Sequence, residues 1–142
     1  MEINFHNKTV LVTGGSRGIG KSIAEDFYLN GANVYRTSTR AISQINDKVN
    51  KNFLKTIKVD FKNKSSSSNF YEKLSQISKI DILINNAGIN KIDLIDKIDE
   101  NDWDNIININ LKTPFRITQI VSKSMKKNSY GRIINLGSIF SV

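Results

Sequence analysis

The stretch Thr-Gly-Gly-Ser-Arg-Gly-Ile-Gly at residues 13–20 decides the fold, because it stands between a predicted strand and a predicted helix. Val and Leu make residues 8–13 a short run typical of a strand. Ile19, Ile23 and Phe27 recur every four residues and form one apolar helical stripe. A strand, a glycine turn and a helix N-terminus together form an anion site, because glycines let a phosphate approach the backbone and the free N–H groups favour negative charge.

The spacing of the glycines indicates which phosphate-containing ligand the loop binds. A glycine-rich segment by itself can be a simple tight turn, but the strand and the helix around this one favour phosphate binding. The spacing is G-x-x-x-G-x-G, and no Gly-Lys-Ser/Thr follows it, which argues against a P-loop nucleoside triphosphatase. We therefore predict that this loop binds a dinucleotide.

Short apolar runs alternate with helical patterns along the rest of the chain, as they do in βαβ units. Further strands are predicted at residues 32–37, 54–60, 81–85 and 132–136, and further helices at residues 40–51, 65–77 and 101–127. Gly31 suits a left-handed C-cap for the first helix, and a serine of the run 65–68 suits an N-cap. The pattern predicts an α/β fold with a Rossmann-type doubly wound parallel sheet, in one domain over residues 1–142.

The composition limits the classes of protein to which the chain can belong. Its 142 residues suit one domain, and the absence of cysteine excludes disulfides and thiolate metal sites. His6 is the only histidine and cannot build a metal site alone, so no metal is expected. The net charge of +8 comes from dispersed lysines, which favours a solvated surface and no nucleic-acid partner. No secretion signal or membrane span is apparent, so we expect a cytoplasmic protein that makes no membrane contact.

Four motifs, in order along the chain, resemble those of the short-chain dehydrogenase/reductase family. The glycine loop is similar to the family's T-G-x-x-x-G-x-G, and residues 85–88 are its N-N-A-G. Asn110 lies where the family has an active-site asparagine, and residues 131–138 resemble the fifth strand that ends in the catalytic serine. Within the family, the chain looks most like the 3-oxoacyl-[acyl-carrier-protein] reductases.

The resemblance implies roles for individual residues. Ser138 would orient the substrate oxygen, and Asn110 would offer its backbone carbonyl to a proton-relay water. Pro114 supports the second role, because it has no N–H to bond that carbonyl and bends the helix. Two alternatives remain, a serine that only caps a turn and a proline kink that serves packing alone. The cofactor-binding residues would be Gly14, Ser16, Arg17, Gly18, Ile19, Gly20, Thr37, Ser38, Asp60, Asn86, Ala87 and Gly88.

The end of the second strand bears on the choice of nicotinamide cofactor. An acidic residue there would bond the adenosine ribose and repel a 2′-phosphate, but residues 35–40 are Tyr-Arg-Thr-Ser-Thr-Arg. Arg17 adds a permanently charged fork that suits phosphate. We therefore expect NADP(H) in preference to NAD(H), although arginines in a loop can serve solubility alone. Asp60 resembles the family's adenine-contacting aspartate, and the alternative is a plain turn residue.

The family's proton donor has no match in this chain. None of the four tyrosines has a lysine four residues on, and the family's Tyr-x-x-x-Lys lies further beyond the serine than Val142. We expect an NAD(P)-dependent oxidoreductase that reduces a ketone such as a 3-oxoacyl thioester, present as its N-terminal cofactor-binding part. The sheet would be incomplete on its C-terminal side, with strand order 3-2-1-4-5. The alternative is a non-catalytic nucleotide-binding or dimerising module. Family members are usually homo-oligomeric, which is doubtful for this chain.

Overall fold

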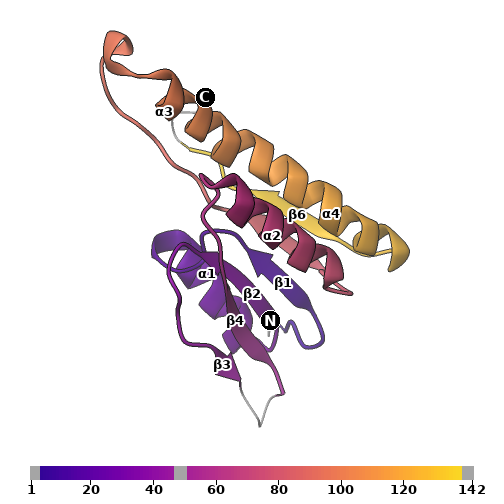
Figure 1. Ribbon diagram of the computed structural model, residues 1–142. Coiled ribbons are helices and arrows are strands. Elements are labelled where there is room, and N and C mark those ends of the chain that lie inside the picture. Colours follow the sequence, from indigo (N-terminus) through magenta and orange to yellow (C-terminus); the bar gives the residue numbers. More distant parts are fainter. Residues whose placement is uncertain (1–3, 47–50, 139–142) are drawn as a thin grey trace.

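The computed structural model describes residues 4–46 and 51–138, which form one six-stranded sheet with helices packed on it (Figure 1). The first half contains β1 (Thr9–Val12), α1 (Gly18–Leu29), β2 (Asn33–Ser38), β3 (Ile45–Asn46), β4 (Phe53–Lys58) and α2 (Lys64–Gln76). The second half contains β5 (Ile82–Asn85), the 3₁₀ turn η1 (Ile95–Lys97), α3 (Glu100–Ile107), the π-helical segment η2 (Asn108–Lys112), α4 (Thr113–Lys127) and β6 (Arg132–Asn135). The predicted Rossmann-type α/β fold is confirmed.

The sheet has the order β3-β4-β2-β1-β5-β6. Its five longer strands pair in parallel, in the order 3-2-1-4-5 predicted from the sequence. The order reverses at β1, where Val10 lies between Val34 of β2 and Ile82 of β5. Ligands of doubly wound folds bind at this switch point, outside the carboxyl ends of the strands. The glycine loop follows β1 and lies there.

Helices cover both faces of the sheet, and a separate apolar cluster lies between the sheet and the helices on each face. On one face, α1 packs Ala24 against Val10, Val12 and Val34. On the other face, α2 and α4 lie side by side (Figure 1) and pack the second cluster around Leu11 and Leu83, with Phe70, Leu74, Ile117 and Val121. Burial on both faces explains why β1 and β5 are almost continuously apolar.

The helix predicted over residues 40–51 is wrong. Ile45 and Asn46 form β3, which pairs antiparallel with Leu54 and Phe53 of β4, and residues 47–50 lie outside the described part. Residues 45–46 make backbone hydrogen bonds with the edge strand β4. A helix over residues 40–51 would have had only its own internal hydrogen bonds and a weak apolar face. No local pattern in the sequence reveals this long-range pairing.

Two other local predictions fail and one is confirmed. Ile19 is 68% exposed, so the buried stripe of α1 does not include it. The cap of α2 is Asn63, whose side chain accepts the N–H of Ser66 at 2.8 Å, and not a serine of the run 65–68. Gly31 has φ +90° and ends α1 in the predicted left-handed cap, with its N–H bonded to the Tyr28 carbonyl.

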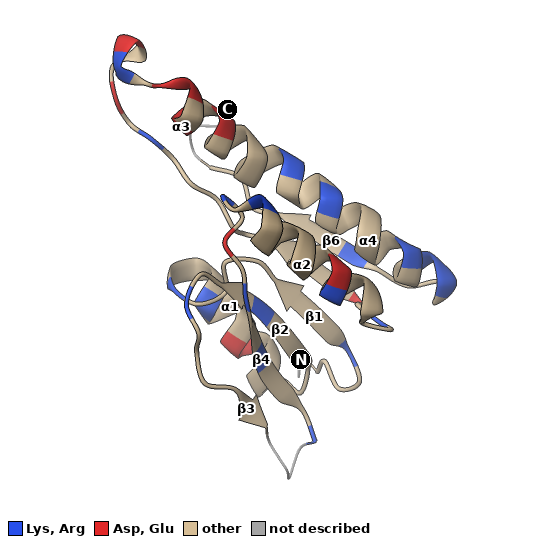
Figure 2. Cartoon of the chain, viewed as in Figure 1, with Lys and Arg blue, Asp and Glu red and all other residues tan. Residues whose placement is uncertain are grey.

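Charged side chains are distributed over several elements. Figure 2 shows Lys and Arg on strands and helices alike, with a series along α4, whereas acidic residues gather on α3 and the loop before it. Within residues 4–46 and 51–138, no helix is long and apolar enough to cross a membrane.

Candidate functional site

The glycine loop is shaped for close approach of a ligand to the backbone. A Cβ atom on Gly20 would overlap the side chain of Asn86 and stand 2.5 Å from the carbonyl oxygen of Gly14, so only glycine fits this position. The helix α1 begins at Gly18, its N-cap residue Arg17 makes no side-chain cap hydrogen bond, and its first turn has no acidic residue. The first N–H groups of α1 therefore form an anion site that the protein itself does not fill.

Thr13 and Asn86 join the glycine loop to the N-N-A-G loop. The buried Thr13 hydroxyl accepts the N–H groups of Asn86 and Ala87, each at 3.0 Å. In return, Nδ2 of Asn86 donates to the carbonyls of Thr13 and Gly14 at 2.9 and 3.1 Å. We call these four hydrogen bonds the Thr13–Asn86 clamp. Thr13 was absent from the predicted site residues, although the threonine of the glycine motif was the signal that could have identified it.

Thr37 holds the glycine loop from the other side. Its side-chain oxygen accepts the N–H of Gly14 at 2.8 Å, and its carbonyl accepts the N–H of Gly15 at 3.0 Å. The hydroxyl oxygen of Ser38 accepts the N–H of Arg40 at 3.0 Å. Both residues are buried. The structure places Thr37 as a support of the glycine loop and Ser38 in the turn after β2, and their contact with a cofactor stays a prediction.

Asn110 lies in the π-helical segment between α3 and α4. The N–H of Thr113 donates to the carbonyl of Asn108, five residues back, and Pro114 cannot donate to the carbonyl of Asn110. The expected bend at the proline therefore takes the form of a π segment. The side-chain amide of Asn110 exchanges two hydrogen bonds with the backbone of Ile89, at 2.9 and 2.8 Å. The side chain thus anchors the loop after Gly88, and the backbone carbonyl remains the group predicted to hold a water.

The remaining predicted residues lie along the same edge of the sheet. Ser138 is exposed and follows β6, which pairs with β5, and Asn110 bonds Ile89 in the loop after β5. Asn135 at the end of β6 accepts from the Asn85 amide at 2.8 Å, which links β6 to the N-N-A-G loop. Asp60 is exposed, and its carboxylate accepts the N–H of Lys62 at 3.0 Å, as the alternative of a turn residue requires. Its contact with adenine stays a prediction.

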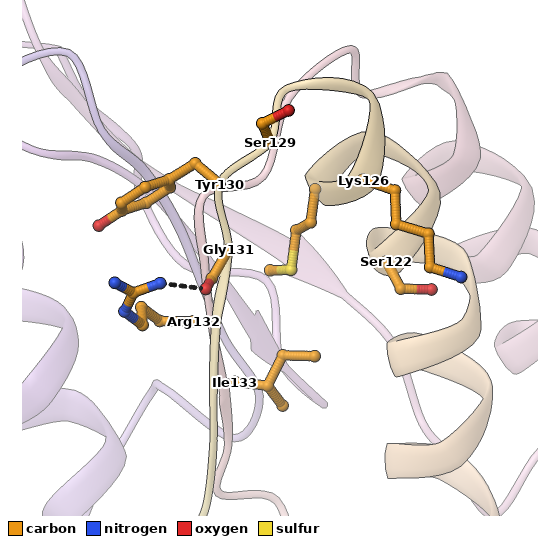
Figure 3. A pocket seen from close by; sticks show the side chains of 8 residues that line it. Ser122, Lys126, Ser129, Tyr130, Gly131, Arg132 and Ile133 are labelled. Atoms are coloured by element: carbon orange, nitrogen blue, oxygen red, sulfur yellow. Dashed lines mark hydrogen bonds between the residues drawn. The ribbon is translucent and has the colours of Figure 1, made fainter.

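A wide hollow of about 580 Å³ lies at the opposite, amino edge of the sheet, between the end of α4 and the start of β6 (Figure 3). Its lining residues are Ser122, Met125, Lys126, Ser129, Tyr130, Gly131, Arg132 and Ile133. It is open to solvent, and none of the predicted site residues lines it. In the part of the chain that the structure describes, no group of three His, Cys, Asp or Glu residues could hold a metal ion.

The fold and the site now define the class of protein. Residues 8–142 match the family model described as short chain dehydrogenase, and the chain therefore belongs to the short-chain dehydrogenase family of NAD(P)-using oxidoreductases. The chain is 37% identical over 140 residues to 3-oxoacyl-[acyl-carrier-protein] reductase FabG of Escherichia coli. That match covers 96% of this chain and 57% of the relative, so the chain spans a little over half the length of such relatives.

Solved structures give the same picture of the fold. The bulky-bulky ketone specific alcohol dehydrogenase from Comamonas testosteroni superimposes with a TM-score of 0.81 at 26% identity, over 96% of this chain and 58% of its own. A putative NAD(P) dependent gluconate 5-dehydrogenase from Beutenbergia cavernae superimposes with a TM-score of 0.82 at 23% identity, over 97% of this chain and 57% of its own.

Proposed function

We propose that the chain is the cofactor-binding part of a ketone reductase that uses NADP(H) and acts on a small carbonyl substrate such as a 3-oxoacyl thioester. The observation that carries the proposal is the Thr13–Asn86 clamp, which fixes a bare glycine loop against the uncapped start of α1. Such a loop suits a pyrophosphate, because its glycines let a phosphate approach the backbone and no side chain caps the first turn of α1. The 3-oxoacyl substrate is suggested by the relative from Escherichia coli.

Each predicted residue has a place in this proposal. Residues 14–20 would hold the pyrophosphate, Thr37, Ser38 and Asp60 the adenosine half, and residues 86–88 the nicotinamide half. The bound cofactor would supply the hydride. Ser138 would orient the substrate oxygen with its hydroxyl, and the carbonyl of Asn110 would hold a water for proton transfer. The preference for NADP(H) is supported by the absence of an acid between residues 33 and 40.

The cofactor site is tested by titrating the purified chain with NADPH, with the nicotinamide fluorescence as the measure of binding. We expect saturable binding that Gly20→Ala abolishes, because the added methyl group would displace Asn86. Ser22→Ala is a matched control on the exposed face of α1 and should bind as the wild type does. Failure of the wild-type chain to bind NADPH or NADH would contradict the proposed function.

The second candidate is a nucleotide-binding module without catalysis, for which the glycine loop and the Thr13–Asn86 clamp would suffice. A chimera that continues residues 1–138 with the rest of the Escherichia coli relative separates the two candidates. If the chimera oxidises NADPH in the presence of a 3-oxoacyl thioester, and Ser138→Ala stops it, the reductase is supported. A folded chimera that binds NADPH without turnover supports the module.

A further inference from the structure

The carboxyl ends of β5 and β6 are joined by a hydrogen bond between two asparagine side chains. Asn85 and Asn135 are register partners in these parallel strands, and Nδ2 of Asn85 donates to Oδ1 of Asn135 at 2.8 Å. The backbone carbonyl of Asn85 also accepts the N–H of Leu136 at 2.9 Å. We call these two hydrogen bonds the Asn85 anchor, because one residue of β5 holds two consecutive residues at the end of β6.

The side chain of Asn85 relies on Asn135 for hydrogen bonding. Asn85 is 5% exposed, and its Oδ1 is a buried atom that no protein donor reaches. Within residues 4–46 and 51–138, the bond to Asn135 is the one hydrogen bond that the Asn85 side chain makes. If Asn135 moved away, a buried amide would have no partner at all, which is unfavourable. The buried amide therefore favours the arrangement in which the end of β6 stays beside β5.

The two ends of β6 are held in different ways. At the amino end, Met125 leaves no room for a Cβ atom on Gly131, so the turn before the strand is packed tightly against α4. At the carboxyl end, the contacts are the Asn85 anchor and the partial burial of Leu136. All four residues of β6 itself are exposed. The carboxyl end is thus the end that can fray, and the anchor opposes fraying.

The Asn85 anchor lies between the two parts of the candidate site. Asn85 directly precedes Asn86 of the Thr13–Asn86 clamp, and Ser138 follows Asn135 by three residues. A hydride transfer requires the substrate oxygen to be held in a fixed position relative to the cofactor, and a misplacement of about 1 Å can lower a rate about 100-fold. The anchor is therefore placed to carry the position of the cofactor loops over to Ser138.

We infer that Asn85 and Asn135 are positioning residues, which fix Ser138 relative to the cofactor-binding loops. The inference rests on the proposed function. Neither side chain has to touch the substrate, because both act through the end of β6. Asn135 is the residue to substitute, since it is exposed and its truncation leaves no cavity, whereas Asn85 is buried and its truncation would also disturb the core.

Amide hydrogen exchange of the purified chain tests the anchor itself. In Asn135→Ala we expect the N–H of Leu136 to exchange at least about tenfold faster than in the wild type, because the strand end opens more often. The N–H of Arg132, which donates to the Asp81 carbonyl at the other end of β6, should change by less than about threefold. NADPH should bind as it does to the wild type, because the glycine loop is unchanged.

Two further variants separate the hydrogen bond from other effects. Asn135→Asp keeps an acceptor oxygen for Nδ2 of Asn85 and should restore the slow exchange of Leu136. Ile133→Ala is the matched control, because it removes a partly exposed side chain from the same strand without removing a hydrogen bond to Asn85. It should leave the exchange of Leu136 within about threefold of the wild type.

The chimera that continues residues 1–138 with the rest of the Escherichia coli relative tests the effect on catalysis. We expect Asn135→Ala to lower kcat for a 3-oxoacyl thioester about 10- to 100-fold. The KM for NADPH should stay within about threefold, since the cofactor loops are intact. Rates are expressed per NADPH site, so that a smaller folded fraction does not count as lost catalysis. Asn135→Asp should recover most of kcat, and Ile133→Ala should retain it.

Several results would overturn the inference. Unchanged exchange of Leu136 in Asn135→Ala would show that the bond does not hold the end of β6. Faster exchange with an unchanged kcat would make the anchor a structural tie only. Equal losses of kcat and NADPH affinity, or equal losses in Asn135→Asp, would assign the effect to the fold as a whole. An unsubstituted chimera that binds NADPH without turnover contradicts the reductase and the positioning role together, whereas an active one confines any failure to the inference.

Discussion

β1 and β6 belong to the same parallel sheet, but their surroundings differ completely. Val10, Leu11 and Val12 of β1 are 0% exposed, whereas all four residues of β6 are exposed. Ile133 and Ile134 point to opposite faces, which is the pattern of a strand covered on both sides. The half of the site around the glycine loop is thus fixed by its own packing. The half that holds Ser138 rests on a strand with little packing, so the two halves should respond differently to substitution.

The largest expected difference is between two isoleucines that are neighbours in the sheet. Ile84 of β5 and Ile134 of β6 are register partners, and they are 2% and 50% exposed. Ile84→Ala should lower the free energy of unfolding by about 2–5 kcal/mol, because it leaves a cavity in the core. Ile134→Ala should cost less than about 1 kcal/mol. Urea denaturation followed by circular dichroism measures both, and equal losses would show that β6 is as well packed as β5.

Gly20→Ala tests whether the packed half tolerates any added volume. The methyl group would meet the Asn86 side chain and the Gly14 carbonyl, so the clamp must shift. We expect a loss of about 1–3 kcal/mol in the free energy of unfolding, typical of overpacking, together with the loss of NADPH binding. Urea denaturation measures the first effect, and wild-type stability of the Gly20→Ala variant would mean that the two loops are not rigidly joined.

Thr13→Val removes one hydroxyl from the clamp while nearly preserving its shape. The N–H groups of Asn86 and Ala87 would then lose their acceptor. A buried N–H without a partner costs about 1–3 kcal/mol, so we expect a loss in this range and faster amide hydrogen exchange at both residues. Thr13→Ser keeps the oxygen and is the matched control. Similar losses for both variants would assign the effect to the methyl group instead.

The sequence predicted the packed half well, because local and global preferences agree there. The strand order, the glycine turn and the cap at Gly31 all follow from residue types with few alternatives. The prediction failed where a distant partner decides the structure. Residues 45–46 form a strand because they pair with the edge of β4, and no local sequence pattern predicts that pairing.

The candidate site shows the same division. Its glycines and Asn86 are recognisable from motif spacing, but Thr13 was missed as a structural member of the site. In the sequence, Arg36 is recognisable only as one residue of the segment 35–40, which lacks an acidic side chain. Its burial depends on Thr56 and Gly15, which come from a different strand and from the loop after β1. A single sequence does not tell which polar residue of a strand becomes buried against a neighbouring strand and loop.

The smallest expected effect is the coupling between substitutions at Gly15 and Arg36. Gly15→Ala places a methyl group 2.7 Å from the Arg36 Cβ, so the loop must lift from β2 at a cost of about 1–3 kcal/mol. Arg36→Gly removes that Cβ, and Gly15→Ala should then cost less, with a coupling of about 0.5–3 kcal/mol in a double-mutant cycle of urea unfolding. The Val12 carbonyl, 3.3 Å from the added methyl, stays in both backgrounds, so part of the cost should persist. If the two substitutions are additive, the loop does not rest on Arg36.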